Sequence, residues 1–330
     1  MARYIAYRVL LMIPTIFVIS IVSFVIIHLP PGDFLTSYVA SITARGESID
    51  DATIQALRNA YGLGEPWHVQ YFKWITGVLH GDFGQSFEYR VGVSSLIWDR
   101  VWLTVAISVI TLIFTWVTAF PIGIYSAVRP YSLLDYVFTL VGFIGLAVPG
   151  FLLALVLLVI AFDRFGMSVG GLFSPTFETA PWSLARVSDL LQHVWMPIVV
   201  LGLYGTASLI RVMRANLMDE LHKPYVTTAR VKGQSELTLL VRYPVRAALN
   251  PFVSTLGWTL PELVSHSTIV AVVLSFPMVG PMLLAALLSQ DMYLAGSFIL
   301  ILSVMTVVGT LLSDIFLAWL DPRIRMRRAN

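Results

Sequence analysis

Long apolar runs constrain this 330-residue chain more than any other feature of its sequence. Each run is about 20 residues or longer, the length that an α-helix needs to cross the hydrocarbon core of a bilayer. Only 12% of the residues are charged, whereas soluble domains carry about 25%. The sequence therefore predicts one all-α polytopic membrane protein with six transmembrane helices. The six runs are 9–29, 101–125, 136–162, 194–213, 252–276 and 292–320.

The first run, 9–29, follows the basic residues Arg3 and Arg8, as the apolar part of a signal peptide does. It is too long for a signal peptide, and no small-residue cleavage site follows it. Further apolar runs come after it. We therefore expect this run to be retained as the first transmembrane helix.

The distribution of lysine and arginine predicts the orientation in the membrane. Cytoplasmic loops carry an excess of these residues, which sets the topology. One face holds 14 of the 21 basic residues, so both termini and the loop 214–250 are expected in the cytoplasm. The 14 are Arg3, Arg8, Arg129, Arg211, Arg214, Lys223, Arg230, Lys232, Arg242, Arg246, Arg323, Arg325, Arg327 and Arg328.

The segment 30–98, on the opposite face, is long for a loop and is expected to fold into helices of its own. Asp50 or Asp51 is placed to cap a helix that ends at Gly62, and a second helix opens at Pro66 and stops before Gly81. In the second helix, Trp67, Tyr71 and Trp74 share one face. We favour packing at the membrane interface over ligand binding for this stripe.

Sequence motifs for catalysis and for metal binding do not occur in this chain. It has no cysteine, no GxxxxGK[ST] loop and no HExxH, GxSxG or DxDxDG motif. Its six histidines show no metal-ligand spacing. We therefore expect neither enzyme activity nor a metal or other cofactor in this chain, and the net charge of +2 gives no indication of nucleic-acid binding.

Glu262 and His266 are ionisable residues inside the fifth apolar run, four positions apart. This spacing puts them on one helical face, where their side chains can bond to each other. Ionisable residues in a membrane are costly and usually face the protein interior or a solute pathway. Three interpretations stay open: a polar patch on a solute pathway, a proton relay, or a satisfied pair against a neighbouring helix. Trp258, one turn earlier, belongs to the same predicted pathway.

The cytoplasmic loop between the fourth and fifth runs contains the stretch YVTTARVKGQSE, residues 225–236. A short helix is expected over 227–231, and Gly233 suits the left-handed position that ends a helix. Ser235 is placed to cap a second helix that starts at Glu236. A short basic helix on this face can lie on acidic lipid headgroups or dock into a groove of a soluble partner. The residues alone leave both possibilities open.

The same loop resembles the coupling-loop motif of ABC importer permeases, in the form found in the dipeptide and oligopeptide branch. The resemblance implies that this stretch is a helix that docks on an ATPase. It departs from the general motif at Thr227, where the wider superfamily has glutamate. The residues so implied are Tyr225, Val226, Thr227, Thr228, Ala229, Arg230, Lys232, Gly233, Ser235 and Glu236.

Three further stretches carry the resemblance over nearly the whole chain. The segment 61–87, YGLGEPWHVQYFKWITGVLHGDFGQSF, is similar to the family's signature after the first span. The run 275–293 is similar to the family's Phe-x-x-Pro-Gly-x-Gly-x-Leu loop that ends in Arg-Asp-Tyr, with departures at Met278, Val279 and Gln290. The terminal motif, 321–325, matches in full.

The resemblance implies a type I ABC importer permease in the bacterial cytoplasmic (inner) membrane. Its implied partners are a second, similar permease, two cytoplasmic ATP-binding subunits and an extracytoplasmic solute-binding protein, with ATP and Mg bound by the ATPases. The implied division is a first transmembrane helix (1–29), an extracytoplasmic helical segment (30–98), a five-helix core (99–320) and a cytoplasmic tail (321–330).

The cargo is the least determined feature. Peptides are the cargo most common in the family, with oligosaccharides, nickel and other solutes as alternatives. Two rival classes also stay open: a proton-coupled secondary transporter that uses Glu262 and His266, and a membrane scaffold that moves no solute.

Overall fold

The computed structural model describes residues 2–29, 32–44, 46, 49–60, 62–167 and 170–320, and within them the fold is built of helices joined by loops. The all-α prediction is confirmed for this part of the chain. The terminal motif, 321–325, and the tail 321–330 lie outside the described residues. The side chain of Trp258 lies outside them as well.

Two compact units make up the chain, and each is described by itself. The first contains the residues up to 104 together with 278–308, and the second contains 105–277 and the residues from 309 onward. Two long helices, α5 (Val93–Val128) and α14 (Met292–Leu320), contribute to both units. The predicted division after residues 29, 98 and 320 stays a prediction.

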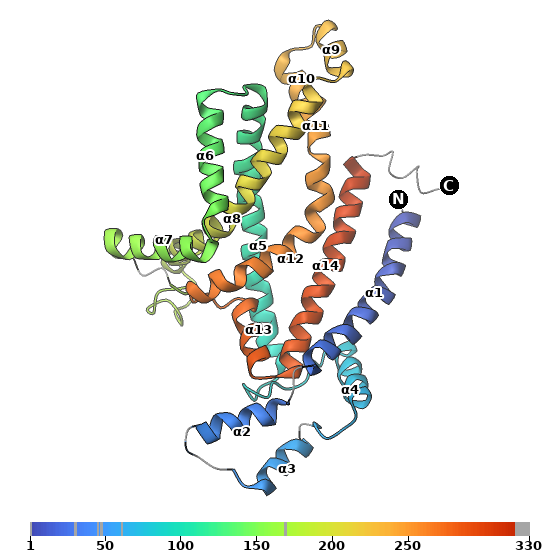
Figure 1. Ribbon diagram of the computed structural model, residues 1–330, viewed down its shortest axis with the longest axis vertical. Helices are drawn as coiled ribbons and strands as arrows, with labels where there is room; N and C mark the ends of the chain where they lie inside the picture. The colour runs from blue at the N-terminus through green and yellow to red at the C-terminus, as the bar shows by residue number, and fades with distance from the viewer. Residues whose placement is uncertain are drawn as a thin grey trace. The chain divides into compact units, whose positions relative to one another are not determined.

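The first unit combines the first transmembrane helix with the helical segment that follows it (Figure 1). Phe24 of α1 packs against Tyr71 and Trp74 of α4 in a buried cluster, which Leu300 of α14 completes. The hydroxyl groups of Ser20 and Tyr71 share a 2.8 Å hydrogen bond next to this cluster. The shorter elements of the unit, besides α1 (Ala2–His28), are α2 (Phe34–Ala44), α3 (Asp51–Ala60), α4 (Trp67–Leu79) and α13 (Val279–Leu288).

Local signals predicted the ends of α3 and α4 correctly. Asp50 lies just before α3, and its carboxylate accepts hydrogen bonds from the amide and the hydroxyl of Thr53. Gly62, after α3, has a φ of +66°, and Gly81, after α4, has a φ of +83°. Both values lie in the left-handed region that glycine adopts without steric cost. α4 begins directly after Pro66.

The aromatic stripe on α4 is divided between the interior and the surface. Tyr71 and Trp74 are buried in the cluster with α1, so the packing interpretation is confirmed for them. Trp67 is 54% exposed, although its ring lies 5.4 Å from the ring of His28 on α1. An aromatic ring with one free face at this position suits the membrane–water interface.

A buried carboxylate joins distant parts of the first unit. Asp291, at the start of α14, is fully buried and accepts hydrogen bonds from the Ser86 hydroxyl and from the amides of Glu88 and Leu294. Burial raises the pKa of this carboxyl, while these donors act in the opposite direction. Two of the family-like stretches, 61–87 and 275–293, therefore meet at one polar centre.

The second unit is organised around the longest helix, α8 (Leu184–Leu221). α6 (Leu133–Ala147) packs along α8, and the short helices that follow α8 in the chain lie at its C-terminal end (Figure 1). The remaining elements of the unit are α7 (Gly150–Phe165), α9 (Pro224–Val231), α10 (Glu236–Arg242), α11 (Pro244–Ala248) and α12 (Asn250–Val273).

The number of transmembrane helices agrees only in part with the sequence. Among the described residues, α1, α5, α8 and α14 are long and apolar enough to cross a membrane. The expected single span 136–162 is instead two helices, α6 and α7, that meet at an angle of 102°. Pro149 lies at the break, directly before α7. Because proline has no amide hydrogen, it cannot donate the hydrogen bond that would continue α6. The expected span 252–276 corresponds to α12, whose described apolar part is Glu262–Val273.

Glycines bring α5 and α8 into close contact within the second unit. A Cβ atom added to Gly123 would lie 2.8 Å from Cβ of Met213, which is fully buried. A Cβ atom on Gly202 would lie 2.6 Å from the ring of Phe114. Small residues at helix interfaces in membranes allow the backbones to approach closely. The contact therefore depends on the absence of side chains at these two positions.

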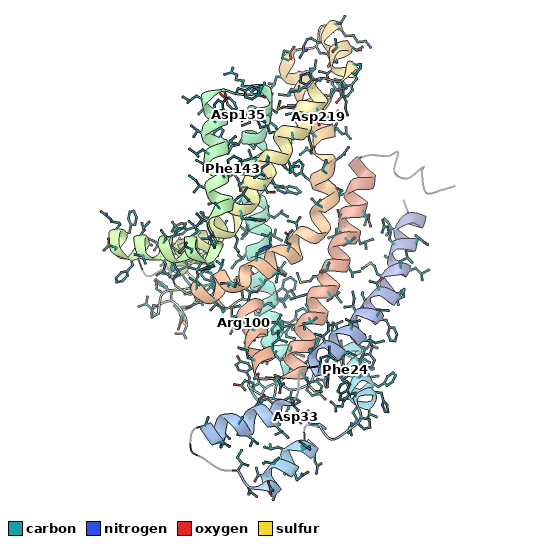
Figure 2. The ribbon with its side chains drawn as sticks, in the orientation of Figure 1. Phe24, Asp33, Arg100, Asp135, Phe143 and Asp219 are labelled. Atoms are coloured by element: carbon teal, nitrogen blue, oxygen red, sulfur yellow. The ribbon has the colours of Figure 1, made fainter. Side chains whose placement is uncertain are left out.

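An ion pair ties α6 to α8 at the end of the unit that carries the basic loop. Asp135 is buried near the start of α6, at the same end as Asp219 on α8 (Figure 2). Its two carboxylate oxygens accept hydrogen bonds of 3.1 and 3.0 Å from the guanidinium of Arg214. The amide of Tyr131 donates a third hydrogen bond. A buried carboxylate satisfied by two-point pairing fixes the geometry of the two helices.

Candidate functional site

The predicted loop helix is present and ends as its sequence indicated. α9 covers Pro224–Val231, and Gly233 follows it with a φ of +76°. The amide of Gly233 donates to the carbonyl of Arg230, and the amide of Gln234 donates to the carbonyl of Ala229. This pair of hydrogen bonds is a Schellman motif, which satisfies carbonyls that the end of a helix leaves unpaired. The prediction of a helix, a left-handed glycine and a turn is confirmed.

The second loop helix also begins where the sequence predicted. Ser235 precedes α10 with extended dihedral angles, and Glu236 is its first residue. The Ser235 hydroxyl lies 2.8 Å from the hydroxyl of Thr238 and makes no side-chain capping bond to a backbone amide of the helix. The position of the N-cap is therefore confirmed, and its hydrogen-bonding partner is a side chain.

A small apolar core holds α9 and α10 together. Val226 and Ala229 of α9 and Leu239 of α10 are buried against one another, with Tyr243 packed at their edge. Two residues of the predicted docking helix, Val226 and Ala229, thus face inward and support the loop. The outward-facing members of the set are Tyr225, Thr227, Thr228, Arg230, Lys232, Gly233, Ser235 and Glu236.

An ion pair closes the turn between the two helices. Arg230 donates to both carboxylate oxygens of Glu236, at 2.6 and 3.0 Å. The hydrogen bonds from Arg230 hold the pKa of the Glu236 carboxyl below its usual value. The two residues flank Gly233, so the pair and the left-handed glycine fix the same turn. This two-point geometry is specific to arginine among the basic residues.

A second charged group connects the loop to the end of α8. The carboxylate of Glu220, one residue before the end of that helix, accepts hydrogen bonds from Lys223 and from the hydroxyl of Tyr225. Burial and the hydrogen bond to Glu220 raise the pKa of the Tyr225 phenol. The first turn of α9 is therefore fastened to α8 by side chains as well as by the backbone.

Exposed apolar side chains lie on the outer surface of the same loop. Val231 is 83% exposed at the end of α9, and Leu237 is 74% exposed in α10. Val241, one turn later, is also exposed. Because these side chains stand beside Arg230 and Lys232, the surface combines apolar and basic groups.

A cavity of about 620 Å³ lies in the second unit between α5, the α6–α7 break, α8 and α12. Most of its wall is apolar, with hydroxyl groups from Thr115, Thr255 and Thr259 among the lining residues. Glu262 and His266 of α12 also line it, as does Tyr204 of α8. The structure thus places two of the three predicted pathway residues, Glu262 and His266, in one cavity.

The spacing of Glu262 and His266 allows their side chains to bond to each other, but the hydrogen bond in the structure is to the Glu262 backbone. Nδ1 of His266 lies 2.9 Å from the backbone carbonyl oxygen of Glu262, and not from its carboxylate. The His266 ring packs on the ring of Tyr204, with 5.8 Å between the centroids. A carbonyl four residues back is always within reach of a helical histidine, so it competes with a side-chain partner.

Tyr204 is a part of the cavity that the sequence did not single out, whereas the break at Pro149 had a signal in the sequence. Tyr204 lies in the fourth apolar run, and nothing in its spacing distinguishes it from other aromatic residues of the chain. Pro149 and Gly150 were visible as a proline–glycine pair inside a long apolar run, which is a signal for a break.

Comparison with known proteins identifies the family. Residues 119–326 match the family described as binding-protein-dependent transport system inner membrane component. Residues 1–108 match the N-terminal part of the same kind of membrane component. The two matches together cover nearly the whole chain.

Individual relatives agree with these matches. The chain is 33% identical to the oligopeptide transport system permease protein AppB of Bacillus subtilis (strain 168), over 98% of this chain and 99% of that protein. It is 30% identical to the glutathione transport system permease protein GsiC of Salmonella choleraesuis, over 99% of this chain and 100% of that protein. It is 26% identical to the dipeptide transport system permease protein DppB of Escherichia coli K12, again over 99% of this chain and 100% of that protein.

A solved structure supports the fold. The chain resembles a subunit of the methionine ABC transporter MetNI in an inward-facing conformation, with a TM-score of 0.51 and 16% sequence identity. The match covers 68% of this chain and 96% of that subunit. This chain belongs to the family of inner-membrane permease components of binding-protein-dependent ABC transport systems.

Proposed function

We propose that this chain is one of two permease subunits of an ATP-driven importer that carries short peptides into the bacterial cytoplasm. Relatives that match over almost their whole length are named for oligopeptide, dipeptide and glutathione transport. These cargoes share a peptide backbone, and that common chemistry supports peptides over oligosaccharides. A soluble binding protein on the outer side delivers the peptide.

The observation that carries the proposal is the folded loop at the end of α8. α9 and α10 form a unit with their own buried core, a closed turn, and an outer surface of apolar and basic groups. A connecting loop that served only to join two spans would need none of these features. In the proposed importer, this surface seats on one of two cytoplasmic ATPases.

α8 gives the loop a direct mechanical connection to the cavity. The helix lines the cavity with residues from Val200 to Val212 and continues without a break to Leu221, three residues before α9. From Tyr204 to Leu221 a helix spans about 25 Å, at 1.5 Å per residue. When ATP closes the two ATPases, movement of the loop is transmitted along α8 to the cavity wall.

The basic residues support a cytoplasmic location for the loop. Arg214 on α8 pairs with Asp135 near the start of α6, and Figure 2 shows Asp135 at the end of the unit where the loop lies. Lys223, Arg230, Lys232 and Arg242 follow in the loop itself. Under the positive-inside rule, these residues support a cytoplasmic location for the loop, and Arg3 and Arg8 support the same location for the N-terminus.

Reconstitution tests the proposal. The chain is co-expressed with the permease, ATPase and binding-protein genes of its own transport system, and the purified complex is placed in proteoliposomes. We expect two ATP-binding subunits to co-purify and labelled tetraalanine to be taken up only with ATP inside and binding protein outside. Uptake driven by a pH gradient without ATPases would establish a secondary transporter instead. Uptake of an oligosaccharide in place of peptide would overturn the proposed cargo.

A further inference from the structure

Within the part of the chain that the structure describes, the cavity in the second unit holds a carboxylate that no basic side chain pairs with. Glu262 lines the cavity from α12, and its side chain is exposed. Among the residues that the structure describes, none donates a hydrogen bond to its carboxylate or forms a salt bridge with it. The described lining of the cavity contains no lysine or arginine, and Glu262 is its one acidic residue.

A carboxylate in a largely apolar cavity is stabilised by a cation or by water. Moving an ionised group into the bilayer interior is costly, so such groups face a polar cavity and pair with an opposite charge. His266 is the other ionisable residue of α12 in the cavity lining. Its Nδ1 lies against the backbone carbonyl of Glu262, and its ring packs on the ring of Tyr204. The Glu262 carboxylate is therefore available to bind a molecule that enters the cavity.

The rest of the cavity matches the other groups of a short peptide. Hydroxyl groups of Thr115, Thr255 and Thr259 provide donors and acceptors for backbone amides. Apolar residues such as Leu263 and Ile269 provide walls for side chains. The volume of about 620 Å³ lies within the range of sites that enclose small ligands.

We infer that Glu262 binds the N-terminal ammonium group of the peptide as it passes through the cavity. This inference rests on the proposed peptide importer and adds a specificity-determining residue to it. An ammonium group is the one cation that short peptides of any sequence share, so a single carboxylate serves many cargoes. A neutral oligosaccharide has no group that would use this charge.

A lysine or arginine of the second permease subunit is the competing partner for Glu262. In that case the carboxylate would hold two subunits together and would not contact the cargo. The two possibilities predict different outcomes when Glu262 is changed. If Glu262 binds the cargo, transport falls while ATP hydrolysis and assembly continue. If it binds the second subunit, assembly itself is weakened.

The test uses the complete transporter in proteoliposomes with labelled tetraalanine as the probe. Glu262→Gln removes the charge with little change in shape, and Glu262→Asp retains it. Thr268→Val is the matched control, since it changes a polar group of α12 that is not part of the cavity lining and leaves the charge unaltered. Uptake, binding-protein-stimulated ATP hydrolysis and co-purification of all subunits are measured for each variant.

We expect Glu262→Gln to lower tetraalanine uptake about tenfold or more, as loss of a charged hydrogen bond does. Assembly and stimulated ATP hydrolysis should stay within about twofold of wild type, and Glu262→Asp and Thr268→Val should retain most uptake. Unchanged uptake in Glu262→Gln overturns the inference. Equal loss of assembly and uptake also overturns it, in favour of the subunit contact.

A chemical cross-link gives a second reading on the wild-type protein, so it does not depend on how a variant folds. A carbodiimide activates the carboxylate, the peptide amine displaces the urea, and an amide bond joins the two. We expect mass spectrometry to find tetraalanine on Glu262 and to find no adduct with N-acetyl-tetraalanine. Absence of the adduct during active uptake contradicts the inference, whereas absence of any peptide uptake by the wild type contradicts the proposed function itself.

Discussion

The Ser86 hydroxyl donates a hydrogen bond to Oδ2 of Asp291, 205 positions further along the chain, with 2.5 Å between the two oxygens. The amides of Glu88 and Leu294 bind the same carboxylate, which is fully buried. One side chain therefore fixes the end of the segment after α4 against the start of α14. A buried donor that loses its acceptor has no hydrogen bond to offset the cost of its removal from water. Substitution of Asp291 should therefore destabilise the first unit strongly.

Asp291→Ala should destabilise the protein by about 2–4 kcal/mol, because it leaves a buried hydroxyl and two amides without their acceptor. Ser289→Ala, on a neighbouring side chain bonded within its own helix, is the control and should cost less than about 1 kcal/mol. Thermal unfolding of the purified protein in detergent measures both. Equal melting temperatures for the two variants would contradict the assigned role of Asp291.

The same residue gives a pH dependence with a defined sign. Burial raises the pKa of Asp291 in the folded protein, so the folded state holds this proton at pH values where the unfolded chain has released it. The contribution of Asp291 to stability is thus fully present below the ordinary carboxyl pKa of about 3.9 and declines as pH rises through the raised value. The difference in melting temperature between wild type and Asp291→Ala should narrow as pH increases. A difference in melting temperature that widens as pH increases would contradict a raised pKa for Asp291.

Gly123→Ala should disrupt the contact between α5 and α8. The new methyl group would meet Cβ of the buried Met213 at 2.8 Å, and a backbone oxygen lies 3.2 Å away, so the helices must separate. Overpacking of this kind costs about 1–3 kcal/mol. Gly142→Ala is the control, since its nearest neighbour, Cβ of Ala207, is at an ordinary 3.6 Å. Thermal unfolding of both variants checks the prediction, and a larger loss for Gly142→Ala would refute it.

Gly233→Val should uncouple transport while the protein still inserts into the membrane. No atom lies within 4 Å of an added Cβ, so the effect comes from the φ of +76°. An L-residue in this region costs about 1–2 kcal/mol, and a β-branched one costs more. Gly166→Val is the matched control, because Gly166 also ends a helix with a positive φ and open space around it. We expect lower peptide uptake for Gly233→Val alone; equal uptake by both variants would argue against a coupling role.

Glu236→Gln should loosen the turn between α9 and α10 without unfolding the rest of the protein. The substitution removes the charge that receives the two hydrogen bonds from Arg230. Hydrogen–deuterium exchange should become faster at the amides of Gly233 and Gln234, which the turn protects. The double variant Arg230→Glu with Glu236→Arg should recover part of this protection. If exchange in the single variant matches the wild type, the ion pair does not hold the turn.

The sequence was most informative where the determinants of structure are local. Gly233 and Gly62 each follow a short helix and adopt a positive φ, which glycine does more easily than other residues. A glycine at such a position therefore predicts where the helix ends. Asp50 and Ser235 precede helices for the same kind of reason, because a short polar side chain suits the N-cap. Hydropathy placed the long helices for the equally simple reason that lipid excludes unpaired backbone groups.

The features that were missed depend on direction or on distant partners. The run 136–162 is apolar throughout, and hydropathy does not report that its two halves differ by 102° in direction. The Ser86–Asp291 pair joins positions with no common pattern in the sequence. The spacing of Glu262 and His266 allowed a bond between their side chains, but spacing cannot choose between the carboxylate and the backbone carbonyl of the same residue.

The small core of Val226, Ala229 and Leu239 has a thermodynamic consequence for any partner that binds the loop. A disordered loop would lose conformational entropy at the moment of binding, and that loss would be subtracted from its affinity. Here the ordering has already taken place during folding. The exposed side chains of Val231 and Leu237 are carried by helices that are already ordered. The free energy of contacts at this surface is therefore not reduced by the cost of ordering the loop. A force applied to the surface should also move α9 and α10 together.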